Sequence, residues 1–181
     1  NNYGRKAKML VMTTTTDHIT VVGLPHAWRQ RLHFLWERFV IYCHLHFSRH
    51  NLFVIDIANA GTDITSLREF KEADLIHLSW INQGMLSLAD IKRIVRSGKP
   101  VVWTMHDLWT ATGICHYARQ CPSFRTGCHN CRLLPRGGGK EDLSRKVWNR
   151  KKALYHNANI HFITCSRWLA GQARPSAMMK G

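Results

Sequence analysis

Acidic residues are scarce in this sequence of 181 residues. Only 11 Asp and Glu stand against 26 Lys and Arg, so the formal net charge is +15. This imbalance excludes a charge-balanced surface and favours an anionic partner: nucleic acid, a phosphorylated substrate or acidic lipid. An excess of Lys and Arg can also serve only to keep a domain soluble. The net charge alone therefore does not decide among these interpretations.

Long hydrophobic runs, internal repeats and low-complexity tracts are also missing. The most apolar long segment is interrupted by Arg29, Arg31, Glu37 and Arg38, which excludes a membrane-spanning helix there. With 45% hydrophobic and 20% charged residues, the chain is globular rather than disordered, and its length suits one domain. No signal peptide opens the chain, which starts at Asn1, so we expect a piece of a longer protein.

Strand-like and helix-like segments alternate along the rest of the chain. Short apolar runs predict strands at 4–12, 52–58, 73–79, 99–104 and 160–165, and three- and four-residue spacing predicts helices at 25–47, 87–98, 143–156 and 166–172. Ser87 followed by Asp90 resembles a capping box, and Gly98 ends that helix. The alternation predicts an α/β fold, with a Rossmann-like parallel sheet and helices on both faces.

Polar side chains follow three of the predicted strands. They are His77, Ser79 and Asn82 at the first, His106 and Asp107 at the second, and Ser166 at the third. Open parallel sheets bind ligands outside the carboxyl ends of their strands, so we predict a site at this edge. The imidazole of His106 can accept or donate a proton near neutral pH, and Asp107 can orient it.

Each of these residues also has a structural interpretation. Asp107 can cap the loop that follows it, with His106 packed inside the protein. His77 is expected to be a buried histidine with its hydrogen bonds satisfied, and Ser166 more readily caps the next helix than binds a ligand. The pattern of residues alone leaves both interpretations open.

Four cysteines follow the predicted site in close succession, at Cys115, Cys121, Cys128 and Cys131. Zn²⁺ takes four thiolate or imidazole ligands tetrahedrally, and His116 and His129 are spare nitrogen ligands. We favour a structural zinc site, because four protein ligands leave no open position for catalysis. Disulfides and free thiols remain alternatives, since only one pair has the two-residue spacing typical of zinc sites.

The predicted helix at 25–47 has two interpretations. Its Trp28, Leu32, Leu35 and Phe39 recur at helical spacing, so we expect this stripe to pack on the sheet with the arginines solvated. The alternative is a helix that lies in the interface of an acidic membrane, because aromatic residues and arginines interleave along it.

Several separated motifs resemble the amino-terminal half of a family 4 glycosyltransferase, in the bacterial branch that builds surface polysaccharides. The resemblance is carried by residues 73–87, 98–109, 112–117, 126–131 and 162–169, which appear in the order typical of that family. It covers most of 52–181, whereas the first fifty residues are less diagnostic.

The resemblance implies a GT-B fold, in which two Rossmann-like domains face each other across a cleft. Residues 1–181 would be part of the acceptor-binding domain, with a Gly-rich first unit before Asn1 and a donor domain beyond Gly181. The implied activity is transfer of a sugar from a nucleotide-sugar to a glycan or lipid-linked acceptor, with retention and without a catalytic metal. His106 would lie beside the donor sugar and the acceptor hydroxyl, with Asp107 as its neighbour. We therefore expect this chain to be inactive alone, and the parent enzyme to be cytoplasmic, at times peripheral at the inner face of the plasma membrane.

One departure from the family pattern affects the site. The family has His-x-His where this chain has His77, Leu78 and Ser79, so one polar contact is expected to change.

The competing class is a basic zinc-containing module that binds nucleic acid, supported by the charge and the cysteines. We give it less weight, because the cysteines lie within an α/β pattern and the aromatic residues do not form a stacking platform.

Overall fold

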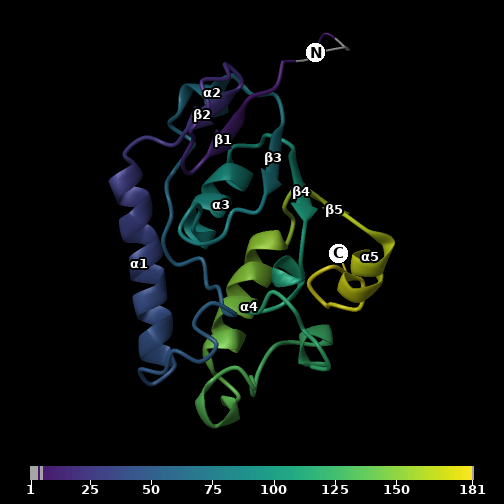
Figure 1. Ribbon diagram of the computed structural model, residues 1–181. Helices are drawn as coiled ribbons and strands as arrows, with labels where there is room; N and C mark the ends of the chain where they lie inside the picture. Colours follow the sequence, from purple (N-terminus) through teal and green to yellow (C-terminus); the bar gives the residue numbers. More distant parts are fainter. Residues whose placement is uncertain (1–3, 5, 181) are drawn as a thin grey trace.

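The chain folds as two small parallel sheets with helices around them. A computed structural model describes residue 4 and residues 6–180 (Figure 1). The first sheet pairs β1 (Met9–Val11) with β2 (Val21–Gly23), and the second has the order β3 (Ile76–Ser79), β4 (Val101–Met105), β5 (Ile160–Thr164). All pairings between these strands are parallel, which confirms the predicted α/β fold.

Five α-helices connect or flank the strands. They are α1 (Ala27–His44), α2 (Arg68–Glu72), α3 (Leu88–Arg96), α4 (Leu143–Tyr155) and α5 (Arg167–Ala173), and short 3-10 turns occupy Trp109–Ala111, Ser123–Arg125 and Pro135–Gly137. Among the described residues, no helix is both long and apolar enough to cross a bilayer.

Local sequence signals account for the boundaries of α3. Ser87 Oγ accepts a hydrogen bond from the Asp90 backbone N–H (3.1 Å), and the Asp90 carboxylate accepts one from the Ser87 backbone (2.9 Å), so the predicted capping box is confirmed. Gly98 adopts a φ of +77°, a left-handed conformation that ends the helix. The inner stripe of α3 is buried as predicted, with Ile91 and Ile94 inaccessible to solvent.

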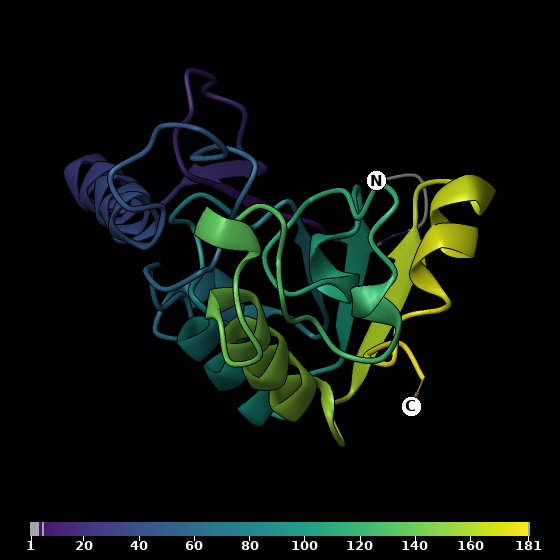
Figure 2. The same cartoon turned by 90° about the horizontal axis from the view of Figure 1, so that it is seen from below.

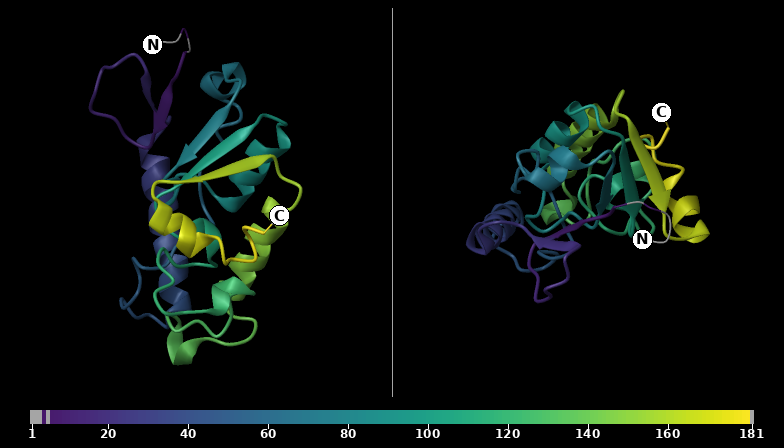
Figure 3. Two further views of the ribbon diagram at one scale, coloured as in Figure 1. Left: turned by 90° about the vertical axis from the view of Figure 1, so that its right-hand side faces the viewer. Right: turned by 90° about the horizontal axis from the view of Figure 1, so that it is seen from above.

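The main sheet is covered on one face only. Its buried face carries Ile76, Leu78, Val101, Trp103 and Met105, and the crossover helices α3 and α4 lie together on one side of the strands (Figures 2 and 3). The opposite face bears the exposed side chains of His77, Ser79, His161 and Ile163. The sequence predicts helices on both faces, and for the described residues this prediction is wrong.

The segment predicted as a strand at 52–58 is irregular instead. It makes one antiparallel bridge, between Ile55 and Cys115, and Asp56 N–H donates to Ile114 O (2.8 Å). Three of its apolar residues, Ile55, Ile57 and Ala58, lie in the core, whereas Phe53 is 65% exposed. The partner segment at 112–115 is itself a loop, so the pairing cannot extend. The predicted strand at 4–12 is shorter than expected, and its residue 5 lies outside the described residues.

Helix α1 has the orientation opposite to the one we expect from its apolar stripe. Trp28, Leu32, Leu35 and Phe39 are each more than half exposed. The buried face instead contains Gln30, Glu37, Arg38 and Ile41. The prediction that the stripe packs on the sheet is therefore wrong, and the arginines are solvated as predicted at Arg29 and Arg31 but not at Arg38, which is buried.

Candidate functional site

The carboxyl ends of β3 and β4 bring two predicted site residues together. Ser79 Oγ and His106 Nε2 share a hydrogen bond of 2.8 Å, and both side chains are exposed. The parallel register causes this contact: Ser79 pairs with Thr104, so His106 lies one step further along the same face. His106 is therefore not packed in the core, and its imidazole is free to meet a ligand at the open edge.

His77 is on the same open face, one step before Ser79. Its Nε2 is 2.7 Å from Thr104 Oγ1, and the ring is exposed. The expectation of a buried core histidine is wrong, because alternation along β3 turns His77 and Ser79 outward and Ile76 and Leu78 inward. The open face of the sheet thus presents two neighbouring hydrogen-bonded pairs, His77 with Thr104 and Ser79 with His106.

Asp107 does not contact His106. Its carboxylate accepts a hydrogen bond from the Trp109 backbone N–H (2.8 Å), which confirms the loop-capping interpretation, and it pairs with His116 Nδ1 (2.7 Å). Both Asp107 and His116 are buried, whereas His106 points to solvent. The Asp107–His116 pair was not apparent from the sequence, since the two residues are separated by a loop without periodicity.

Trp80 is a second residue at this edge that sequence reasoning missed. Its indole stacks on the His116 ring, with ring centroids 5.4 Å apart and planes at 21°, and 48% of the residue remains exposed. Its φ of +38° is strained for a tryptophan, and places the ring directly after β3. The sequence signal that could have identified Trp80 was its position immediately after Ser79, at the end of a predicted strand. The edge therefore combines a flat apolar surface with an imidazole and a hydroxyl.

The two remaining predicted residues serve mainly local structure. Asn82 is buried, and its Nδ2 has no hydrogen-bond partner in the structure. Ser166 Oγ accepts from the Leu169 backbone N–H (3.1 Å) and so caps α5, as the structural interpretation predicts. Thr164 of β5 pairs with Met105 of β4, so Ser166, which follows Thr164 closely, lies at the same edge of the sheet as His106.

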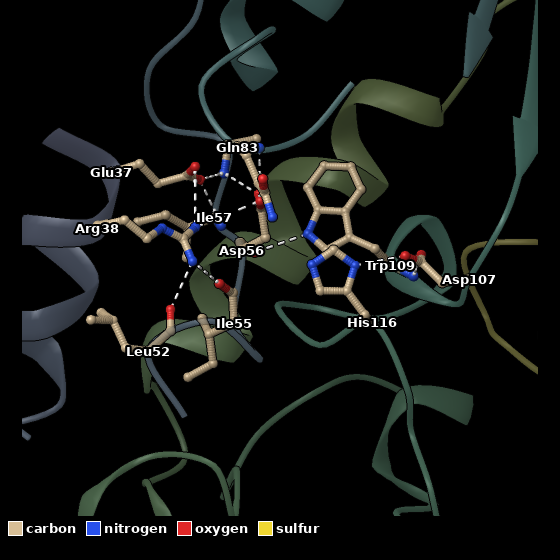
Figure 4. A network of polar contacts seen from close by, with 11 residues as sticks. Glu37, Arg38, Leu52, Ile55, Asp56, Ile57, Gln83, Asp107, Trp109 and His116 are labelled. Carbon is tan, nitrogen blue, oxygen red and sulfur yellow. Dashed lines mark hydrogen bonds and ion pairs between the residues drawn. The ribbon is translucent and has the colours of Figure 1, made fainter. Parts of the chain in front are cut away.

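Behind this edge lies a buried polar centre formed by Glu37, Arg38 and Asp56 (Figure 4). Arg38 donates to the carbonyls of Leu52 (2.7 Å) and Ile55 (2.9 Å) and lies 3.2 Å from the Glu37 carboxylate. Glu37 accepts from the backbone N–H groups of 57 and 58 at 3.1 and 2.6 Å. These contacts satisfy the backbone of the irregular segment 52–58, and they explain why α1 buries charged residues.

Trp109 connects the buried centre to the site. Its indole Nε1–H donates to Asp56 O (2.9 Å), while its backbone N–H is held by Asp107. Figure 4 shows this indole between Asp56 and the Asp107–His116 pair. Trp109 thereby joins the loop after β4 to segment 52–58, and Trp80 meets this loop by stacking on His116.

Lys151 of α4 lies beneath the same loop and is inaccessible to solvent. Its Nζ donates to Trp109 O (2.7 Å) and Thr112 O (3.2 Å), and is 3.3 Å from the centroid of the Trp109 ring. Burial lowers the pKa of Lys151 to about 7. Burial, with the nearby Asp56 carboxylate, raises the pKa of Glu37 to about 7. The interior therefore holds two groups that titrate near neutrality.

The four cysteines of the predicted metal site line one cavity of about 20 Å³, together with His129. Cys128 Sγ accepts a hydrogen bond from the Gly113 N–H (3.2 Å). Burial raises the pKa of Cys128 to about 12 and that of Cys131 to about 11. The thiols thus face a common space, but within residue 4 and residues 6–180 no three candidate ligands lie close enough together to hold a metal ion.

A larger cavity of about 160 Å³ lies between the cysteine loop and α5. Arg119, Arg125 and Gln172 are among its lining residues. It contains none of the residues at the ends of β3 and β4, so it is separate from the site described above.

Comparison with known proteins finds one informative relative. It is the Escherichia coli (strain K12) protein named "Putative colanic acid biosynthesis glycosyl transferase WcaC". Over 63 residues the two sequences are 35% identical. This chain is similar to a glycosyltransferase. The matched segment is 33% of this chain and 15% of the relative, so the chain matches a small part of that protein. No family model matches the chain, and no solved structure matches it.

Proposed function

We propose that this chain is the acceptor-side domain of a retaining glycosyltransferase of family 4, with a GT-B fold, in polysaccharide synthesis. The observation that carries the proposal is the Ser79–His106 pair, which lies exposed at the carboxyl ends of adjacent parallel strands. Open parallel sheets bind their ligands at this edge. Similarity to a protein named as a colanic acid glycosyltransferase supports the same function.

Each residue of the edge has a role in this proposal. His106 contacts the acceptor hydroxyl and the donor sugar, and its bond to Ser79 orients the imidazole. Asp107 positions the loop and His116 rather than exchanging protons itself. Trp80 offers a sugar ring an apolar surface beside polar partners, as ligand sites commonly do. His77 extends the acceptor surface along β3, whereas Asn82 is buried and Ser166 caps α5 beside it.

The test is sugar transfer by the whole protein that contains this chain, assayed as nucleotide release from UDP-glucose, UDP-galactose, GDP-mannose and GDP-fucose. We expect His106→Ala to lower kcat/KM by about 10²–10⁴-fold, the range for a residue that transfers or holds a proton. His161→Ala is the matched control, because His161 is exposed on the same sheet but belongs to the first half of β5.

Two results would contradict the proposal. One is equal activity in the His106→Ala and His161→Ala variants. The other is the absence of transfer from every donor. The chain alone is expected to show no transfer, because the acceptor side cannot align a donor without a facing domain. Transfer by the isolated chain would overturn this division into two domains.

We also propose that Cys115, Cys121, Cys128 and Cys131 bind a structural zinc ion. The shared cavity and the Gly113 N–H bond to Cys128 support the donor set. Binding requires the thiols to close around the ion, because among the described residues no three candidate ligands lie close enough together to hold one. One equivalent of zinc by elemental analysis, lost in Cys128→Ser but kept in Cys43→Ser, is the expected result. A metal-free chain of unchanged stability after chelation would eliminate the site.

We place this activity in the cytoplasm, at the inner face of the plasma membrane.

A further inference from the structure

Helix α1 carries an apolar stripe that nothing in the described structure covers. Five large side chains form it, and each is between 51% and 60% exposed: Trp28, Leu32, Leu35, Trp36 and Phe39. Their spacing of three, four, seven and eight residues places them on one side of the helix. Trp36 and Phe39 also contact each other, with ring centroids 5.9 Å apart. We call these five residues the outer stripe.

Positive charge borders the outer stripe on both sides. At about 100° per residue, Arg29 and Arg31 project to opposite flanks of the stripe, and both are exposed. Arg29 lies over the Trp28 ring, 5.3 Å from its centroid. The only acidic residue of α1 is Glu37, which is buried on the inner side. The outer surface of the helix therefore carries no negative charge.

The outer stripe cannot turn inward, because the opposite side of α1 is clamped to the protein. Arg38 is bonded to two carbonyls of segment 52–58, and Gln30 Nε2 donates to Thr62 Oγ1 (2.6 Å). A Cβ added at Gly84 would meet the backbone N of Phe34 at 2.6 Å, so the loop after β3 touches the helix backbone. Rotation of α1 would break all of these contacts.

We propose that the outer stripe of α1 binds to the surface of an anionic lipid bilayer, with α1 lying parallel to the membrane plane. An apolar surface flanked by arginines is the arrangement of an interfacial helix, in which the apolar side chains enter the acyl boundary and the guanidinium groups meet lipid phosphates. The net charge of +15 adds long-range attraction to such a surface. A second copy of this chain is disfavoured as the occupant, since it would bring the arginines and the excess charge of both copies together. The proposal deepens the membrane location given under the proposed function, and its test measures binding and not transfer, so the two can fail separately.

The test is co-sedimentation of the chain with vesicles of phosphatidylglycerol and phosphatidylcholine, compared with vesicles of phosphatidylcholine alone. We expect the anionic vesicles to bind at least about tenfold more tightly, and the difference to shrink as salt is added. The variants Leu35→Ser/Phe39→Ser and Arg29→Gln/Arg31→Gln should each reduce binding about tenfold or more. All four side chains are exposed, so circular dichroism should show an unchanged fold.

Matched controls separate the outer stripe from general stickiness and charge. Leu75→Ser/Ile163→Ser removes two comparably exposed apolar side chains elsewhere, and Lys92→Gln/Arg96→Gln removes two exposed charges from α3. Both should bind like the unaltered chain. Brominated lipid should quench the fluorescence of Trp28 and Trp36, and this quenching should disappear in Trp28→Phe/Trp36→Phe.

Three results would overturn the proposal. The first is no binding to either kind of vesicle. The second is an equal loss of binding in the stripe variants and the controls. The third is a dimer in solution that dissociates in Leu35→Ser/Phe39→Ser without vesicle binding, which would assign the outer stripe to a second copy of the chain.

Discussion

The buried centre around Arg38 and the open edge around His106 are both built from polar side chains, but these side chains have different roles. Inside, Arg38 donates two hydrogen bonds to backbone carbonyls and contacts the Glu37 carboxylate. The side chains of Glu37, Arg38 and Asp56 are all buried. At the edge, Ser79 and His106 are paired only with each other and face solvent. The inner groups determine where segments lie, while the outer groups retain capacity for a ligand.

The strongest way to test this contrast is to remove the buried cation. Arg38→Met should lower the free energy of unfolding by about 3–5 kcal/mol, because it leaves two buried carboxylates and two carbonyls without their partner. Urea denaturation measures the loss. Arg31→Met, on the exposed flank of α1, should change stability by less than about 0.5 kcal/mol. Equal effects of the two substitutions would remove the distinction between the regions.

The buried amine of Lys151 provides a test by pH. Its pKa in the folded protein is about 7, below the ordinary value of 10.5, so above pH 7 the unfolded chain binds more protons than the folded one. The cost of burying this amine therefore shrinks as pH increases from 7 to 9, so the free energy of unfolding rises by up to about 1.4 kcal/mol per pH unit. Lys151→Met should reduce that rise relative to the unaltered chain in denaturation curves at each pH. Parallel curves for the two proteins would show that the amine is not desolvated.

Trp80 tests the open edge as a place for a sugar. In the whole protein, Trp80→Ala should raise the acceptor KM about tenfold, equivalent to about 1.4 kcal/mol, while Trp80→Phe should retain most of the affinity. Trp168→Ala, which removes another exposed indole, is the control. If KM is unchanged in Trp80→Ala, the indole is not part of the acceptor surface.

A Ser→Ala substitution at one buried and one exposed position compares the same chemical change inside the protein and at the open edge. Ser176 is fully buried and donates to Ala111 O (2.7 Å), so Ser176→Ala should cost about 1–3 kcal/mol by leaving that carbonyl unpaired. Ser79→Ala removes an exposed hydroxyl and should change stability by less than about 0.5 kcal/mol. Thermal unfolding of the pair measures the difference, and the reverse order would refute the contrast.

Features that depend on neighbouring residues were predictable from the sequence. The capping box of α3, its inner stripe and the strands from β3 to β5 follow from local periodicity and hydrogen bonding. The meeting of polar side chains at the ends of β3 and β4 was also predictable, because topology alone brings the ends of parallel strands to one edge. The contact between Ser79 and His106 is a consequence of that register.

Features that depend on distant partners were not predictable. The side of α1 that is buried is decided by the bonds of Glu37 and Arg38 to a segment 14 to 21 residues away, which outweigh its apolar stripe. The pairing of Asp107 with His116 likewise depends on how the loop returns. In both cases, a charged or polar group finds a partner that periodicity does not encode.

The clamped inner side of α1 has a practical consequence for producing the protein. Because the inner side of α1 is held by Gln30, Arg38 and Ile41, detergent or serine replacements on the opposite side should improve behaviour in solution and crystallisation while leaving the edge with Ser79 and His106 intact. Solubility and chemistry can thus be engineered as separate properties of one helix and one strand edge.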